Sequence, residues 1–144
     1  MERSVSELEE RILASFSAQG LMSTLGAEIV HVSRGEVHIT LPSRHELSQQ
    51  HGYVHAGALT SVVDSACGYA AQTVAPSGHE VLTVEFKVNF MLPALADRFL
   101  AIGKVIKAGK TLTVCQGQVI GEHGSKQETV AVMQATIMNI PAKN

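Results

Sequence analysis

The sequence predicts an α+β domain in which a curved antiparallel sheet of about six strands wraps one long helix. Residues 56–74 combine a wide apolar face with many small side chains, which is typical of a buried helix. Segments rich in β-branched residues, separated by turn residues, lie on both sides of it in the sequence. The 144 residues suit one folding unit, so residues 1–144 are expected to form a single domain.

The N-terminal part, residues 1–20, predicts an extra amphipathic helix over residues 6–19. Leu8, Ile12 and Phe16 recur at four-residue spacing, and Gly20 is expected to end the helix. Residues 26–41 then alternate polar and apolar side chains around an Arg34-Gly35 turn. This pattern predicts a β-hairpin.

Residues 42–55 are polar and show no apolar period, so they predict a long loop. Loops of that length inside compact domains are usually functional or disordered. The helix at 56–74 follows directly, and its polar residues, Asp64 among them, fall on one stripe. Because its other faces are apolar, the sheet has to cover it.

The rest of the chain predicts four strands, at residues 81–91, 98–108, 111–122 and 127–140. Short turns separate several of them, so we expect each strand to pair antiparallel with its neighbour in the chain.

The composition excludes several classes of protein. The formal net charge is −2 and no basic run occurs, so no nucleic-acid partner is expected. Gly, Ser and Asp interrupt every apolar stretch before the ~18 residues that a membrane span needs. The acidic N-terminus does not resemble a signal peptide, and Cys67 and Cys115 suit reduced core thiols. We therefore expect a cytoplasmic protein with no membrane partner.

Candidate chemistry is concentrated between Gln49 and Asp64. The first turn of a helix leaves backbone N–H groups without partners, and the helix dipole adds partial positive charge there. Small side chains at Ala56 and Gly57 would let a substrate carbonyl approach these donors. The start of the 56–74 helix is thus a candidate oxyanion hole, with His55 placed just before it.

Asp64 is the only carboxylate between His55 and His79. Either it faces solvent on the polar stripe, or it lies in a cleft as a general base or a nucleophile. His45, His51 and His55 suggest a zinc site, but no cysteine or second carboxylate accompanies them. Known nucleotide-binding and nucleophile-elbow motifs are absent. No metal and no cofactor are predicted.

At this point the sequence resembles a known family. The run Gln49-Gln50-His51-Gly52-Tyr53-Val54-His55-Ala56-Gly57, followed by Asp64, resembles the hotdog thioesterases of the PaaI type. Their pattern is Asn or Gln, two residues, Gly, two residues, His-Gly-Gly, and then an acid in the central helix. The segments at 84–94 and 108–112 also look like this family. The resemblance implies a hotdog fold and hydrolysis of acyl-CoA thioesters.

The resemblance also implies roles for single residues. Asp64 would be the general base or nucleophile, and the backbone N–H of Ala56 would polarise the thioester carbonyl. Gln49 would orient substrate or water, His55 would support the loop, and Thr83 would hold the attacking water. Gly57 would border the substrate, and Lys107 and Lys110 are expected contacts for the CoA phosphates.

The family builds its site across a dimer interface, so the resemblance implies a homodimer. Two such dimers are expected to assemble as a dimer of dimers, which is a homotetramer. One subunit would supply the loop and helix start, and the other the carboxylate. The sequence departs from His-Gly-Gly at Ala56, which keeps the N–H but narrows the space above the carbonyl. Two alternatives stay open: a non-catalytic acyl-CoA-binding protein, and a hotdog hydratase or dehydratase, whose motif is not found.

Overall fold

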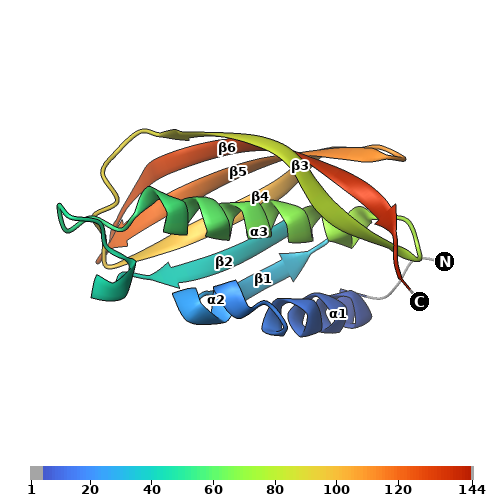
Figure 1. Cartoon of the computed structure of the whole chain (residues 1–144), viewed down its shortest axis with the longest axis horizontal. Coiled ribbons are helices and arrows are strands. Elements are labelled where there is room, and N and C mark those ends of the chain that lie inside the picture. The colour runs from blue at the N-terminus through green and yellow to red at the C-terminus, as the bar shows by residue number, and fades with distance from the viewer. Residues whose placement is uncertain (1–4, 144) are drawn as a thin grey trace.

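The computed structural model describes residues 5–143 and shows one antiparallel sheet wrapped around a long helix (Figure 1). The sheet contains six strands in the order β1-β2-β4-β5-β6-β3. The predicted α+β architecture is confirmed. The helices and strands are α1 (Val5–Ser17), α2 (Gly20–Leu25), β1 (Glu28–Ser33), β2 (Glu36–Pro42), the 3₁₀ helix η1 (His45–Leu47), α3 (Ala56–Val74), β3 (His79–Phe90), β4 (Arg98–Ala108), β5 (Leu112–His123) and β6 (Lys126–Pro141).

The central helix α3 has the predicted bounds and contacts all six strands. Two glycines in the sheet allow this close packing. A Cβ atom at Gly103 on β4 would lie 2.3 Å from the backbone carbonyl carbon of Ala66, and one at Gly117 on β5 would lie 2.6 Å from the side chain of Val63. The small side chains of α3 and these glycines therefore bring helix and sheet together from both sides. Within the described residues, no helix is long and apolar enough to cross a lipid bilayer.

The predicted N-terminal helix is confirmed as α1, but it ends at Ser17, two residues before the predicted end. Gly20 begins the short helix α2 instead of ending the first helix. Met22 and Leu25 are buried, which holds the extra turn against the core. The glycine that ends this region is Gly26, whose φ of 72° is left-handed and suits a residue without a side chain.

The pairing of β3 also differs. It was expected beside β4, but it pairs with β6 at one edge of the sheet, while β4 pairs with β2 and β5. Residues 91–97 make the crossing, and backbone hydrogen bonds join them to Val54, Val130 and Glu122 along the way. This arrangement places β3 and β1 at opposite edges, so the sheet covers α3 from both sides.

The polar loop at 42–55 is ordered by two buried side chains. Leu47 in η1 and Val54 both pack into the core, and an isolated bridge joins Ser48 to Val54. His55 donates its backbone N–H to the carbonyl of Leu47 at 2.7 Å. The loop therefore delivers the chain to the start of α3 in a defined conformation.

Candidate active site

Asp64 is half-buried on the face of α3 that is turned toward β3. Its Oδ1 accepts a hydrogen bond from Thr83 Oγ1 at 2.8 Å. Burial raises the pKa of Asp64 above its usual value, and the hydrogen bond from Thr83 opposes that shift. A raised pKa brings a carboxylate nearer to the range in which it exchanges protons at neutral pH. In the single chain Asp64 is therefore partly shielded from solvent by β3 instead of lying fully exposed on the polar stripe of α3.

Asp64 borders a cavity of about 420 Å³, a size within the range of small-molecule sites. Its walls are formed by α1 with the adjoining Gln19, one face of α3, and the first half of β3. Gly68, one turn after Asp64, carries no side chain, and an added Cβ would meet nothing within 4 Å. The lining residues are Arg11, Ile12, Ser15, Gln19, Asp64, Ser65, Gly68, Tyr69, Gln72, Glu80, Val81, Leu82 and Thr83.

The start of α3 presents a backbone donor. His55 caps the helix, and its Nδ1 accepts the N–H of Gly57 at 2.8 Å. A Cβ at Gly57 would lie 3.0 Å from that ring nitrogen, so the glycine makes room for the cap. The N–H of Ala56 has no acceptor among the residues that the structure describes. The open backbone N–H at the start of α3 is therefore that of Ala56, the donor to which the resemblance assigns the thioester carbonyl.

Gln49 organises the loop before this donor. Its Oε1 accepts the backbone N–H groups of His51 at 2.6 Å and Tyr53 at 3.2 Å. Gln49, His55 and Ala56 share a second cavity of about 350 Å³. The remaining lining residues come from the loop, α3, the end of β3 and the β3–β4 connection: Gln50, Tyr53, Val54, Leu59, Phe90, Leu92, Pro93 and Ala94.

Within one chain these two groups do not meet. Ala56 and Asp64 are eight residues apart on α3, which corresponds to about 12 Å along the helix axis. They line different cavities, and Thr83 accompanies Asp64 only. Lys107 and Lys110 are exposed and line neither cavity. No cavity described for the single chain is therefore lined by both Ala56 and Asp64.

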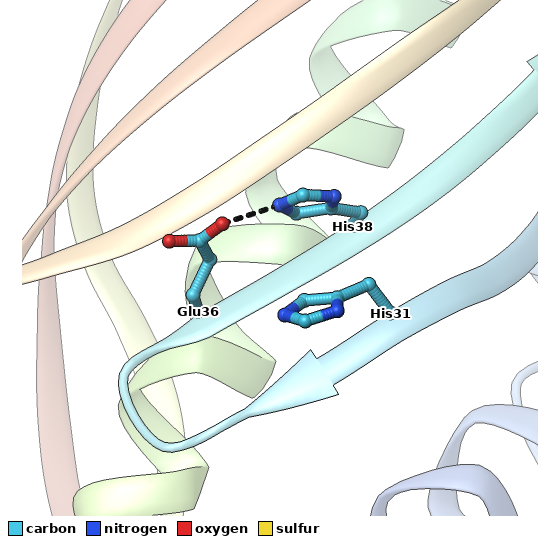
Figure 2. A group of neighbouring side chains, drawn as sticks. All are labelled: His31, Glu36 and His38. Atoms are coloured by element: carbon cyan, nitrogen blue, oxygen red, sulfur yellow. Dashed lines mark hydrogen bonds and ion pairs between the residues drawn. The ribbon is translucent and has the colours of Figure 1, made fainter.

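Another polar group lies on the β1–β2 hairpin (Figure 2), whose strands line neither cavity. Its possible ligand atoms, from His31, Glu36 and His38, lie within 4.8 Å of one another. His38 Nε2 and Glu36 Oε2 are 2.6 Å apart, and Lys104 Nζ is 3.7 Å from the other carboxylate oxygen. Burial raises the pKa of Glu36, but the hydrogen bond to His38 and the positive charge of Lys104 outweigh burial and lower this pKa below its usual value. Because Lys104 already neutralises this carboxylate, we interpret the group as an ion-paired network.

In the described part of the chain, His45, His51 and His55 do not form such a group with one another. Cys67 and Cys115 are free and buried, as predicted. Burial raises the pKa of Cys115 to about 12 and that of Cys67 further, which makes both thiols poor nucleophiles.

The sequence did not predict which residues form the wall of the cavity opposite Asp64. Ser15 and Gln19 come from the N-terminal helical region, and Tyr69 lies five residues after Asp64 on α3. The i, i+4 spacing of Ser15 and Gln19 is a signal that they share a face. Nothing in the sequence shows that this face is turned toward Tyr69, because that depends on how α1 packs on α3.

Comparisons with known proteins identify the family of the chain. Residues 51–128, more than half of the chain, match the family model described as Thioesterase superfamily. The chain belongs to the thioesterase superfamily. This match includes His55, Ala56, Asp64 and Thr83, and it confirms the resemblance to hotdog thioesterases.

Solved structures and a curated relative support the same family. A thioesterase family protein from Silicibacter pomeroyi is 41% identical, with a TM-score of 0.91 over 94% of this chain and 99% of that one. The fold also matches the PaaI protein of E. coli, with 22% identity and a TM-score of 0.86 over 97% and 99% of the two chains. A 1,4-dihydroxy-2-naphthoyl-CoA hydrolase of Listeria monocytogenes is 26% identical over 103 residues, 72% of this chain and 84% of the relative. Together these support a hotdog-fold hydrolase of the thioesterase superfamily.

Proposed function

We propose that this protein hydrolyses acyl-CoA thioesters, with Asp64 as the reacting carboxylate. The observation that carries the proposal is the half-buried Asp64 with its raised pKa, bonded to Thr83 at the edge of a cavity of about 420 Å³. Perturbed carboxyl groups inside cavities are typical of catalytic sites. Membership in the thioesterase superfamily supports the thioester as the bond that is cleaved.

Two routes use the same geometry. As a general base, Asp64 removes a proton from water, and the water oxygen attacks the thioester carbonyl. The C–S bond then breaks, and the proton taken up by Asp64 passes to the leaving sulfur, so that CoA leaves as a thiol and the carboxylate is regenerated. As a nucleophile, Asp64 forms an acyl anhydride, CoA leaves, and water then hydrolyses the anhydride. Thr83 orients the carboxylate in both routes by donating its hydroxyl proton to a hydrogen bond with Asp64, and its oxygen can still accept a hydrogen bond from the attacking water.

The oxyanion that forms in either route needs a donor. The open N–H of Ala56 suits it, with the dipole of the 19-residue helix α3 behind it. Because Ala56 and Asp64 line separate cavities in one chain, the donor for each Asp64 is proposed to come from Ala56 of the partner subunit. In this proposal Gln49 and His55 hold the loop that carries the donor.

The free edge of the sheet supports such a dimer. Among the described strands, β3 pairs only with β6, and its other edge is open. Large apolar side chains on it are exposed, including Leu82 at 58%, Val84 at 50% and Phe86 at 43%. Exposed edge strands and apolar patches of this kind are rarely left uncovered in stable proteins. Pairing of β3 with β3 of a second copy would cover them.

The test is release of free thiol from a panel of acyl-CoA thioesters by purified protein. Asp64→Asn should abolish release while the protein stays folded by circular dichroism. Asp97→Asn, a substitution at an exposed carboxylate on the β3–β4 connection, is the matched control and should keep full activity. Tight binding of acyl-CoA without turnover by the unmodified protein would instead favour the non-catalytic binding function.

A further inference from the structure

The β1–β2 hairpin presents a group of side chains that the proposed reaction does not use. His31 lies directly opposite His38 in the register of the two strands, and Glu36 is two residues before His38 on β2. Because alternate residues of a strand share a face, Glu36 and His38 point to the same side of the sheet. The other side of β2 carries Val37 and Ile39, which are buried in the core. The group therefore lies on the outer face of the sheet, turned away from the core.

A β-bulge in β1 brings His31 to that outer face. Strict alternation from Ile29, which packs against the core, would point Val30 outward and His31 inward. The register instead shifts between Ile29 and His31, so that His31 pairs with His38 on the outer face. Val32, the next residue, is buried. Bulges are frequent beside functional sites, where they re-aim a side chain. Here the bulge places two imidazole rings together, with their centroids 4.6 Å apart.

The three side chains are of the types that bind divalent transition metals. One possible ligand atom from each residue lies within 4.8 Å of the other two, and Figure 2 shows the rings and the carboxylate gathered beside the hairpin. A zinc ion bonded at about 2.0–2.2 Å holds its ligands roughly 3–4 Å apart, so the group is within about 1 Å of a binding geometry. Rotation of the side chains can supply that movement, because His31 is exposed and the other two residues are only half-buried.

The ion pair with Lys104 leaves one oxygen of the carboxylate for a metal. Lys104 Nζ is 3.7 Å from Glu36 Oε1, whereas Glu36 Oε2 faces His38 Nε2 at 2.6 Å. The Lys104 side chain is 58% exposed, so it can also turn toward solvent. Ser33 Oγ lies 2.9 Å from His31 Nε2. A bond from one ring nitrogen to an oxygen is the usual way in which a histidine ligand is oriented.

We propose that His31, Glu36 and His38 bind one divalent transition-metal ion, of which Zn²⁺ is the representative. The ion takes the place of the hydrogen bond between Glu36 and His38, and Glu36 Oε1 keeps its ion pair with Lys104. Two imidazoles and a carboxylate suit zinc, copper and nickel, whereas Mg²⁺ and Ca²⁺ prefer oxygen ligands alone. Three protein ligands leave at least one coordination position for water.

The site is tested by isothermal titration calorimetry of chelator-treated protein with ZnCl₂, a measurement that does not depend on thioester hydrolysis. The binding event of highest affinity should have a stoichiometry of one ion per chain, and MgCl₂ should give no such event. Loss of an outer partner of a metal ligand typically costs about 10- to 100-fold in affinity, so loss of a ligand itself should cost at least roughly 10-fold. His31→Ala, Glu36→Gln and His38→Ala should each weaken zinc binding by that factor.

His123→Ala is the matched control. His123 Nδ1 also lies beside a surface carboxylate, 3.5 Å from Asp97 Oδ1, but no second histidine joins that pair within the described part of the chain. This variant should keep the zinc affinity of the unmodified protein. Lys104→Met removes a competing positive charge and should strengthen zinc binding by roughly 1.5- to 5-fold, the range for a surface ion pair.

Absence of zinc binding by the unmodified protein would overturn the proposal. So would a highest-affinity event that His31→Ala and Glu36→Gln leave unchanged, or one that His123→Ala weakens equally, because other histidines would then hold the ion. Thermal melts followed by circular dichroism check that the metal-free variants stay folded. Added ZnCl₂ should raise the Tm of the unmodified protein and of His123→Ala but not that of His31→Ala, because an ion that binds the folded state stabilises it.

Discussion

Replacement of Gly103 by alanine tests how α3 is seated on the sheet. The new Cβ would lie 2.3 Å, 2.4 Å and 2.5 Å from backbone atoms of Ala66 and Cys67, whereas ordinary contacts begin near 3.4 Å. Backbone atoms cannot rotate away as a side-chain end can, so α3 and β4 must separate locally by about 1 Å. Overpacking of this kind costs about 1–3 kcal/mol, and a clash with backbone belongs at the upper end.

For a chain of this length each kcal/mol lowers Tm by about 3–4 °C. Gly103→Ala is therefore expected to lower Tm by roughly 10 °C in a thermal melt followed by circular dichroism. The control is Gly68→Ala on α3 itself, where an added Cβ meets nothing within 4 Å. It should preserve or raise Tm, because alanine favours a helix by about 1 kcal/mol over glycine.

The same displacement should reach the active site, since Ala66 is only two residues from Asp64. A shift of about 1 Å in a reacting group can cost on the order of 10²-fold in rate. At low temperature, where most of the Gly103→Ala protein stays folded, its activity should therefore fall by much more than the fraction of folded protein does. An unchanged Tm for Gly103→Ala would refute the reasoning, because it would show that α3 does not rest directly on β4 at this point.

Three further predictions concern charge and assembly. Asp64→Asn should raise stability at neutral pH in chemical denaturation, because the native carboxyl has a raised pKa. The gain should shrink as the pH falls and should vanish below the unfolded-state pKa of about 3.8, where the carboxyl is protonated in both states of the natural protein. Thr83→Val removes the hydrogen bond that lowers the pKa of Asp64, so the acid limb of the kcat/KM–pH profile should move to higher pH. A shift to lower pH would contradict the assignment of that limb to Asp64. Phe86→Asp on the open edge of β3 should dissociate the proposed dimer in sedimentation analysis and reduce activity as it dissociates, whereas Val30→Asp, at a residue 56% exposed on β1, should do neither.

Local patterns in the sequence were sufficient for much of the fold. The bounds of α3 follow from the change at His55 from an aperiodic polar loop to an apolar helical period, and the turn residues between the later segments predicted β4–β6 closely. The N-terminal helix was less predictable. Gly20 has the residue type of a helix end, but the burial of Met22 and Leu25 extends helical structure beyond it, and burial depends on contacts with distant strands.

The candidate site was likewise only partly predictable from the sequence. The sequence placed a carboxylate, a capping histidine and small residues near one helix, because residues close in the chain have a spacing that helix geometry dictates. It could not show that Ala56 and Asp64 line separate cavities, since that depends on where the loop and β3 lie around α3.

What local sequence determined here is the helix, most of the strands and the chemical groups of the site, because propensity and periodicity act over short distances. Only the tertiary structure placed β3 at the open edge beside β6 and turned Ser15 and Gln19 toward Tyr69. Those arrangements depend on contacts between residues tens of positions apart, which no local pattern encodes.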